Sequence, residues 1–168
     1  MTRMSRPLLL QAVSALTALL IGTAVYLLDR RPETVYFMAG WMAGGSHGNP
    51  VFGALGAHLP TFVHTYAFIL LTVVFTSASR AHAIAICCMW LAIDSLFEFA
   101  QTPVIAQAIV NNVPDWFGAV PFLENTSAYF LSGTFDVLDL YSIAAGALAA
   151  YLTIVISNRR TLNHASNV

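Results

Sequence analysis

The chain has 168 residues, of which 58% are hydrophobic and only 9% are charged. Soluble domains usually carry about 25% charged residues, so this composition indicates a protein of the lipid bilayer. The formal net charge is −1, which gives no basic surface of the kind that binds nucleic acid. The sequence therefore predicts an all-α, polytopic membrane protein with membrane lipid, and no nucleic acid, as its partner.

Four apolar segments approach the roughly 20 residues that a membrane-spanning helix needs. The first is 7–28, and we interpret it as a retained anchor because it exceeds the apolar stretch of about 7 to 15 residues in a signal peptide. The other three are 61–78, 81–101 and 137–157. We predict a single domain, 1–168, built as a bundle of four transmembrane helices and ending in a polar C-terminal tail, 158–168.

The arginines indicate how the bundle is oriented, because cytoplasmic loops keep basic residues near helix ends. All of the basic residues are Arg, and Arg30 and Arg31 lie together in the first loop. If both termini are cytoplasmic, the remaining arginines are cytoplasmic too. These are Arg3, Arg6, Arg80, Arg159 and Arg160. We therefore predict cytoplasmic termini and two longer outer loops, 35–60 and 102–136.

The two outer loops differ in composition. Residues 38–58 are rich in glycine, and the sequence leaves open whether they form a flexible loop, a re-entrant segment or an interfacial hairpin. Residues 104–123 are interrupted by Pro114 and Pro121 and carry aromatic side chains, which settle at the headgroup boundary. We expect short interfacial helices there.

Polar residues on three of the predicted spans fall at one depth. They are His64, Glu98, Gln101, Asp136 and Asp139, with Asp94 about one turn deeper. Neighbours on each helix are three or four residues apart and so share a helix face. An ionisable group in hydrocarbon costs roughly 2.5 to 3.5 kcal/mol, so such residues normally face the bundle interior or a wet cavity. The pattern predicts a polar pocket in the outer leaflet.

Each of these residues also has a simpler explanation. Asp136 and Asp139 can cap the helix that follows them. His64 can be a hydrogen-bonded histidine of the bundle, and Glu98 can lie in water at headgroup level. Their occurrence together favours the pocket.

Three stretches resemble the VanZ-like family of small bacterial integral membrane proteins. "LPTFVHTYAF" (59–68) resembles the first family element, "EFAQ" (98–101) matches the E-x-x-Q element, and "SGTFDVLDLYSIAAGALAAY" (132–151) is similar to the third. Gly133 and Ile143 stand where the family usually has Arg and Asn. The resemblance implies a place in the bacterial cell envelope, in the inner (cytoplasmic) membrane, and it brings no settled reaction.

Three functions remain open from the sequence. The first is a non-enzymatic envelope protein whose pocket binds a lipid headgroup, a glycolipid or a partner helix, in a monomer or a homo-oligomer. The second is a membrane-embedded hydrolase or transferase acting on a lipid-linked substrate, with His64, Glu98 and Asp139 as candidate metal ligands or acid-base groups. The third is a subunit of an ion- or proton-coupled transporter. No motif identifies a cofactor.

Overall fold

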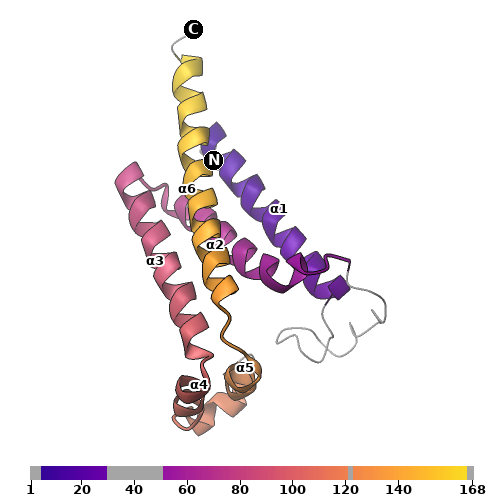
Figure 1. The fold of residues 1–168 in the computed structure, drawn as a ribbon. Coiled ribbons are helices and arrows are strands. Elements are labelled where there is room, and N and C mark those ends of the chain that lie inside the picture. The colour runs from indigo at the N-terminus through magenta and orange to yellow at the C-terminus, as the bar shows by residue number, and fades with distance from the viewer. Residues whose placement is uncertain (1–4, 30–50, 121–122, 166–168) are drawn as a thin grey trace.

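The protein is a helical bundle in its computed structural model, which describes residues 5–29, 51–120 and 123–165 (Figure 1). Within these ranges every regular element is a helix. The four long helices are α1 (Arg6–Asp29), α2 (Leu55–Thr76), α3 (Arg80–Ala100) and α6 (Val137–Ala165). Each contains a stretch long and apolar enough to cross a membrane. The predicted all-α bundle of four membrane-spanning helices is confirmed.

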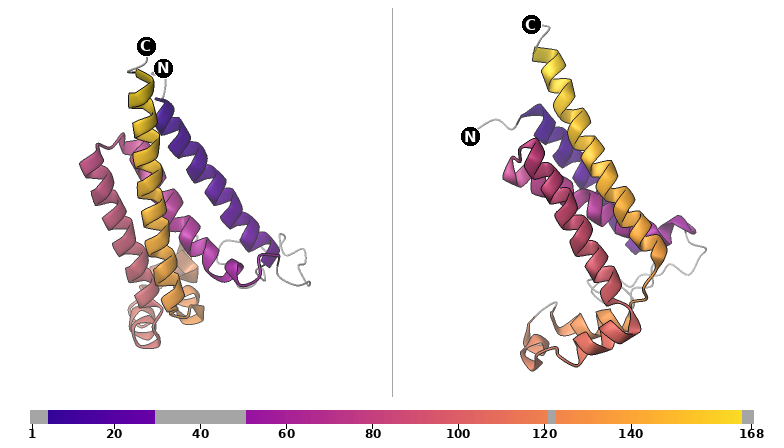
Figure 2. Two further views of the ribbon diagram at one scale, coloured as in Figure 1. Left: turned by 45° about the horizontal axis from the view of Figure 1, so that its top comes forward. Right: turned by 60° about the vertical axis from the view of Figure 1, so that its left-hand side comes forward.

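Helices α2 and α6 form the centre of the bundle, and α1 and α3 lie on either side of them. Helix α2 packs against the other three, and α6 contacts α1 and α3 as well. The start of α1 and the end of α6 lie at one end of the bundle, and the short helices α4 and α5 lie beyond the other end (Figures 1 and 2). We call this second end, where α1 and α3 finish and α2 and α6 begin, the pocket end.

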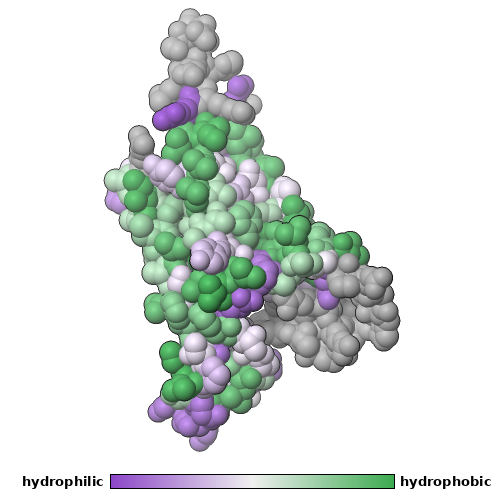
Figure 3. All heavy atoms as spheres, in the orientation of Figure 1, coloured by the Kyte–Doolittle hydropathy of each residue, from purple (hydrophilic) through white to green (hydrophobic). Residues whose placement is uncertain are grey.

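On α1, mostly small side chains face the interior of the bundle and large ones face outward. The buried face of α1 recurs every three or four residues and consists of Pro7, Gln11, Ala15, Ala18, Gly22 and Val25. Leu16 and Leu20 of the same helix are exposed. Small residues let membrane helices approach closely, and lipid tails solvate the outward leucines. Accordingly, hydrophobic residues cover much of the side of the bundle in Figure 3.

The closest approach of α2 and α6 occurs at Gly146. A Cβ atom on this residue would lie 2.6 Å from the backbone carbonyl oxygen of Phe62. Beyond the crossing, a buried apolar core that includes Ile69, Leu70 and Ile154 fills the half of the bundle away from the pocket end. A glycine is therefore required where these two helices cross.

Helix α2 begins six residues before the predicted start at Thr61. We expected Pro60 to precede the helix, but it lies inside the second turn. The proline removes one backbone hydrogen bond, which would have joined its N–H to the carbonyl of Gly56, and the rest of the helix continues past it. The carboxylate of Asp29 also orders this region, since it accepts hydrogen bonds from the N–H groups of Val51 (2.7 Å) and Phe52 (2.9 Å).

Helix α6 extends further than predicted, through Ala165. We expected residues 158–168 to form a polar tail outside the helix. The stretch up to Ala165 contains neither Gly nor Pro, and adding a residue to an existing helix is much easier than starting one. The polar residues after 157 therefore continue the helix and do not terminate it.

The second loop carries short helices, as expected. They are α4 (Pro103–Val110), the 3₁₀ helices η3 (Asp115–Ala119) and η4 (Leu123–Asn125), and α5 (Thr126–Ser132). Pro103 stands at the start of α4, a position that favours proline. In the glycine-rich loop, residues 38–50 lie outside the described part of the chain, 51–54 lead into α2, and 55–58 form its first turn.

Candidate functional site

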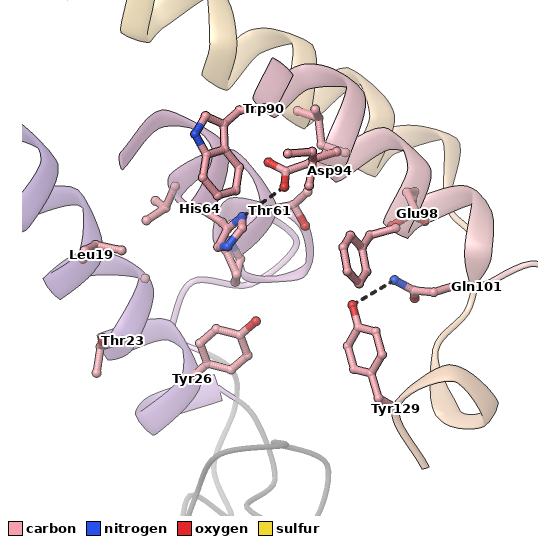
Figure 4. Close-up of a pocket in the computed structure, with 16 residues that line it drawn as sticks. Leu19, Thr23, Tyr26, Thr61, His64, Trp90, Asp94, Glu98, Gln101 and Tyr129 are labelled. Atoms are coloured by element: carbon pink, nitrogen blue, oxygen red, sulfur yellow. Dashed lines mark hydrogen bonds and ion pairs between the residues drawn. The ribbon is translucent and has the colours of Figure 1, made fainter. Parts of the chain in front are cut away.

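A pocket of about 650 Å³ opens between the spanning helices at the pocket end of the bundle. Helices α1 and α3 form its two sides and α2 forms its floor (Figure 4). A polar group of side chains lies on α3, and aromatic and aliphatic groups complete the wall. The lining includes Tyr26, His64, Trp90, Asp94, Phe97, Glu98, Gln101, Tyr129 and Ile143.

Asp94 is held by two residues of α2. Its Oδ2 atom accepts a hydrogen bond of 2.6 Å from the hydroxyl of Thr65, which is fully buried. Its Oδ1 atom lies 3.4 Å from Nδ1 of His64, as the dashed line in Figure 4 marks. Asp94 is only 8% exposed and His64 is 49% exposed. A buried carboxylate therefore stands directly behind an accessible imidazole.

Two aromatic rings hold the imidazole of His64. The ring of Phe68 lies 4.3 Å from it between centroids, and the ring of Trp90 meets it edge-on at 6.1 Å. The indole N–H of Trp90 donates to the hydroxyl of Thr72 at 3.0 Å, which fixes the orientation of the indole. Because Nδ1 faces Asp94, the second ring nitrogen of His64 is the one available to a group in the pocket.

Glu98 lies one turn after Asp94 and is 5% exposed. Its Oε1 atom accepts a hydrogen bond of 2.6 Å from the backbone N–H of Asp136. This bond connects the end of α3 to the start of α6. Among the described residues no hydrogen bond reaches its other carboxylate oxygen, which leaves that atom to the pocket.

Gln101 and Tyr129 close the pocket on the side of the short helices. The Gln101 amide lies 3.4 Å from the Tyr129 hydroxyl. Burial is the main cause that raises the pKa of the Tyr129 phenol, and nearby Tyr26 and Glu98 raise it further. The phenol is therefore neutral at pH 7 and offers a hydroxyl to the pocket.

Asp136 and Asp139 form a separate group beside the pocket. The carboxylate of Asp139 accepts a hydrogen bond of 3.0 Å from Nδ1 of His58 at the start of α2. The carboxylate of Asp136 lies 4.0 Å from the same ring nitrogen and also accepts a hydrogen bond from the N–H of Leu138 at 2.8 Å. The capping explanation thus applies to Asp136, and neither aspartate lines the pocket.

The structure therefore divides the six predicted site residues into two groups. His64, Asp94, Glu98 and Gln101 face the pocket. Asp136, just before α6, and Asp139, in its first turn, both lie next to His58. The backbone N–H of Asp136 connects them to the first group through its hydrogen bond to Glu98. In the described part of the chain, no three His, Cys, Asp or Glu side chains gather as a metal site. His64, Glu98 and Asp139 thus have separate partners.

Several residues of the site were missed in the sequence. The sequence predicts a loop at His58, because Pro60 is expected to precede the helix. Tyr129 lies on α5, a helix of seven residues that apolar periodicity does not reveal. Thr65 and Tyr26 carry no sequence signal beyond being polar groups within apolar spans, which is itself a mark of helix contacts in membranes.

Gly133 and Ile143, which differ from the VanZ-like pattern, each lie against residues of the site. A Cβ atom at Gly133 would overlap the side chain of Gln101, so the amide occupies the space of any side chain there. Ile143 is buried and contributes to the apolar part of the pocket. Comparison of the chain with protein-family models, curated proteins and solved structures gives no match.

Proposed function

We propose that this chain is a multi-pass protein of the bacterial cell envelope whose pocket binds the headgroup of a membrane lipid or glycolipid. The observation that carries the proposal is the pocket itself, which combines buried carboxylates with apolar and aromatic walls inside a bundle of membrane-spanning helices. Small-molecule sites are typically concave, mostly apolar, and lined by a few polar groups that fix orientation.

A headgroup fits this space better than a partner helix. The cavity measures about 650 Å³, within the usual range of roughly 300 to 1,000 Å³ for small-ligand sites. A partner helix would need an open groove along the outer face of the bundle. Acyl chains of a bound lipid would instead extend along the outward-facing aliphatic side chains of α1 and α3.

The arginine distribution supports a place for the pocket in the outer leaflet. Arg6 and Arg159 lie at the end of the bundle away from the pocket. If basic residues stay in the cytoplasm, both termini are cytoplasmic and the pocket opens toward the outer surface of the inner membrane. A reporter fused to the C-terminus that functions only in the cytoplasm tests this orientation, and an inactive fusion would contradict it.

A substitution that fills the pocket tests binding directly. Thr23 lines the pocket from α1 (Figure 4), so Thr23→Trp is expected to displace the occupant. Thr17 lies on the same helix, is exposed and does not line the pocket, so Thr17→Trp serves as the matched control. Native mass spectrometry of the purified variants should show lipid retained by the control and lost from Thr23→Trp. Equal retention by both would contradict the proposal.

A second candidate function, a membrane-embedded hydrolase, is favoured by the contact between His64 and Asp94. A buried carboxylate that orients an imidazole is the arrangement of a general base. The free nitrogen of His64 would take a proton from water as the water oxygen bonds to a carbonyl carbon or phosphorus, and would return that proton to the leaving oxygen. His64→Gln would then abolish turnover while lipid stays bound, and unchanged turnover would exclude this role.

The third candidate, a transporter subunit, has less support. The polar groups of the pocket lie toward one end of the bundle, and the core of the other half is apolar except for Gln11 and Ser157, which hydrogen-bond to each other. Ion or proton transfer requires polar groups at successive depths.

A further inference from the structure

The charge of the pocket lining restricts which headgroup can enter. This inference rests on the proposed binding function. Asp94 and Glu98 are both more than nine-tenths buried, lie four residues apart on one face of α3, and line the same cavity. Two carboxylates at this depth are costly unless positive charge or several donors compensate them.

The protein compensates these carboxylates only in part. Asp94 receives the Thr65 hydroxyl and faces the imidazole of His64, and Glu98 receives one backbone N–H. No Arg or Lys is among the described residues that line the pocket. Within the described chain Arg6 and Arg159 lie at the opposite end of the bundle. A carboxylate oxygen of Glu98 is left without a donor in that same part of the chain.

We propose that the group bound between Asp94 and Glu98 is an ammonium group. An ammonium carries three N–H donors and a positive charge, which supplies what the lining lacks. Trp90, Phe97 and Tyr26 also line this cavity, and an aromatic ring attracts a cation that lies over its face. A phosphate or carboxylate placed there would meet two like charges and, among the described lining residues, no basic side chain.

The ammonium can come from two sources that share this chemistry. One is the headgroup of an amine-bearing membrane lipid such as phosphatidylethanolamine, whose phosphate would remain near the mouth of the pocket. The other is a free small amine. Competition by ethanolamine against the lipid distinguishes them.

The test compares lipids on the purified wild-type protein by native mass spectrometry. Phosphatidylethanolamine is expected to bind about 10- to 100-fold more tightly than its N-acetylated form or phosphatidylglycerol, because one charge-assisted contact is lost in each. Displacement by millimolar ethanolamine would support the ammonium and point to a free amine as the natural ligand. If phosphatidylethanolamine binds most tightly and ethanolamine does not displace it, the ammonium group that binds is part of a lipid headgroup.

Neutral variants of matched shape test the two carboxylates. Glu98→Gln and Asp94→Asn should lose most of the preference for phosphatidylethanolamine. Glu124→Gln and Asp115→Asn make the same chemical changes at exposed positions outside the pocket and should keep the preference. The comparison of lipids on the wild type needs no variant and stands even if a variant fails to fold.

The failure of this inference is distinguishable from failure of the binding function. If all three lipids bind equally and Thr23→Trp abolishes binding, the pocket binds lipid but does not recognise an ammonium group. Tighter binding of either anionic lipid also overturns the ammonium. If none of the lipids binds, both the inference and the proposed function are overturned.

Discussion

Single residues on α2 determine how the carboxylates of α3 are held. Thr65 is fully buried and donates to Asp94, and His64, its neighbour in sequence, contacts the other oxygen of that carboxylate. Adjacent residues of an α-helix point in directions about 100° apart. His64 and Thr65 can therefore contact the same carboxylate only because Asp94 lies between those two directions. Asp94 therefore fixes the rotation of α3 relative to α2 at the level of the pocket.

Removing the hydroxyl of Thr65 tests this role. Thr65→Val keeps the shape of the side chain but leaves a buried carboxylate oxygen without its donor, which should lower the free energy of unfolding by about 1 to 3 kcal/mol. Thr76→Val is the control, because the Thr76 hydroxyl is exposed and bonds only to the carbonyl of Thr72 in its own helix. That change should stay within about 0.5 kcal/mol. Unfolding in mixed detergent micelles measures both, and equal losses would contradict the role given to Thr65.

Sequence spacing predicted the residue pairs on one helix but not those between helices. Asp94 and Glu98 share a face because they are four residues apart, and both line the pocket. The partner of Asp139 is His58, 81 residues earlier in the chain. Such a pair depends on how α2 and α6 pack and on where α2 begins, and neither follows from the local pattern.

At the level of elements, the long helices were predictable because the bilayer sets their length and composition. Their boundaries were not, because Pro60 lies within α2 and a polar sequence continues α6. Short helices in the second loop were predicted, but the position of α5, which brings Tyr129 to the pocket, was not. A helix of one or two turns is stabilised by its tertiary contacts rather than by its own propensity, so a single sequence does not show it.

The crossing of α2 and α6 should be sensitive to a single methyl group. Gly146→Ala places a Cβ atom against the Phe62 carbonyl, so the helices must separate. A loss of about 1 to 3 kcal/mol is expected from overpacking, although alanine is the better helix former. Gly118→Ala is the control because its Cβ would meet no atom within 4 Å. If both variants unfold at the same denaturant concentration, the helices do not cross as described.

At the level of the whole molecule, the bundle has an apolar half and a half with a pocket. The apolar half holds α1, α2 and α6 together through small residues and a buried core. In the other half, α1 and α3 line opposite sides of the cavity, and α5 contributes Tyr129 to it. The division leaves a space at one end of the bundle, where we propose that the polar part of a lipid binds.

The most direct test of the binding function is native mass spectrometry of the detergent-purified protein together with metal analysis of the same sample. The wild type and the control Glu124→Ala, which is altered outside the pocket, are expected to retain a lipid that Glu98→Ala loses. The metal content is expected to be the same in all three proteins. Loss of a bound metal from Glu98→Ala with lipid unchanged, or absence of lipid from all three proteins, would contradict lipid binding in this pocket.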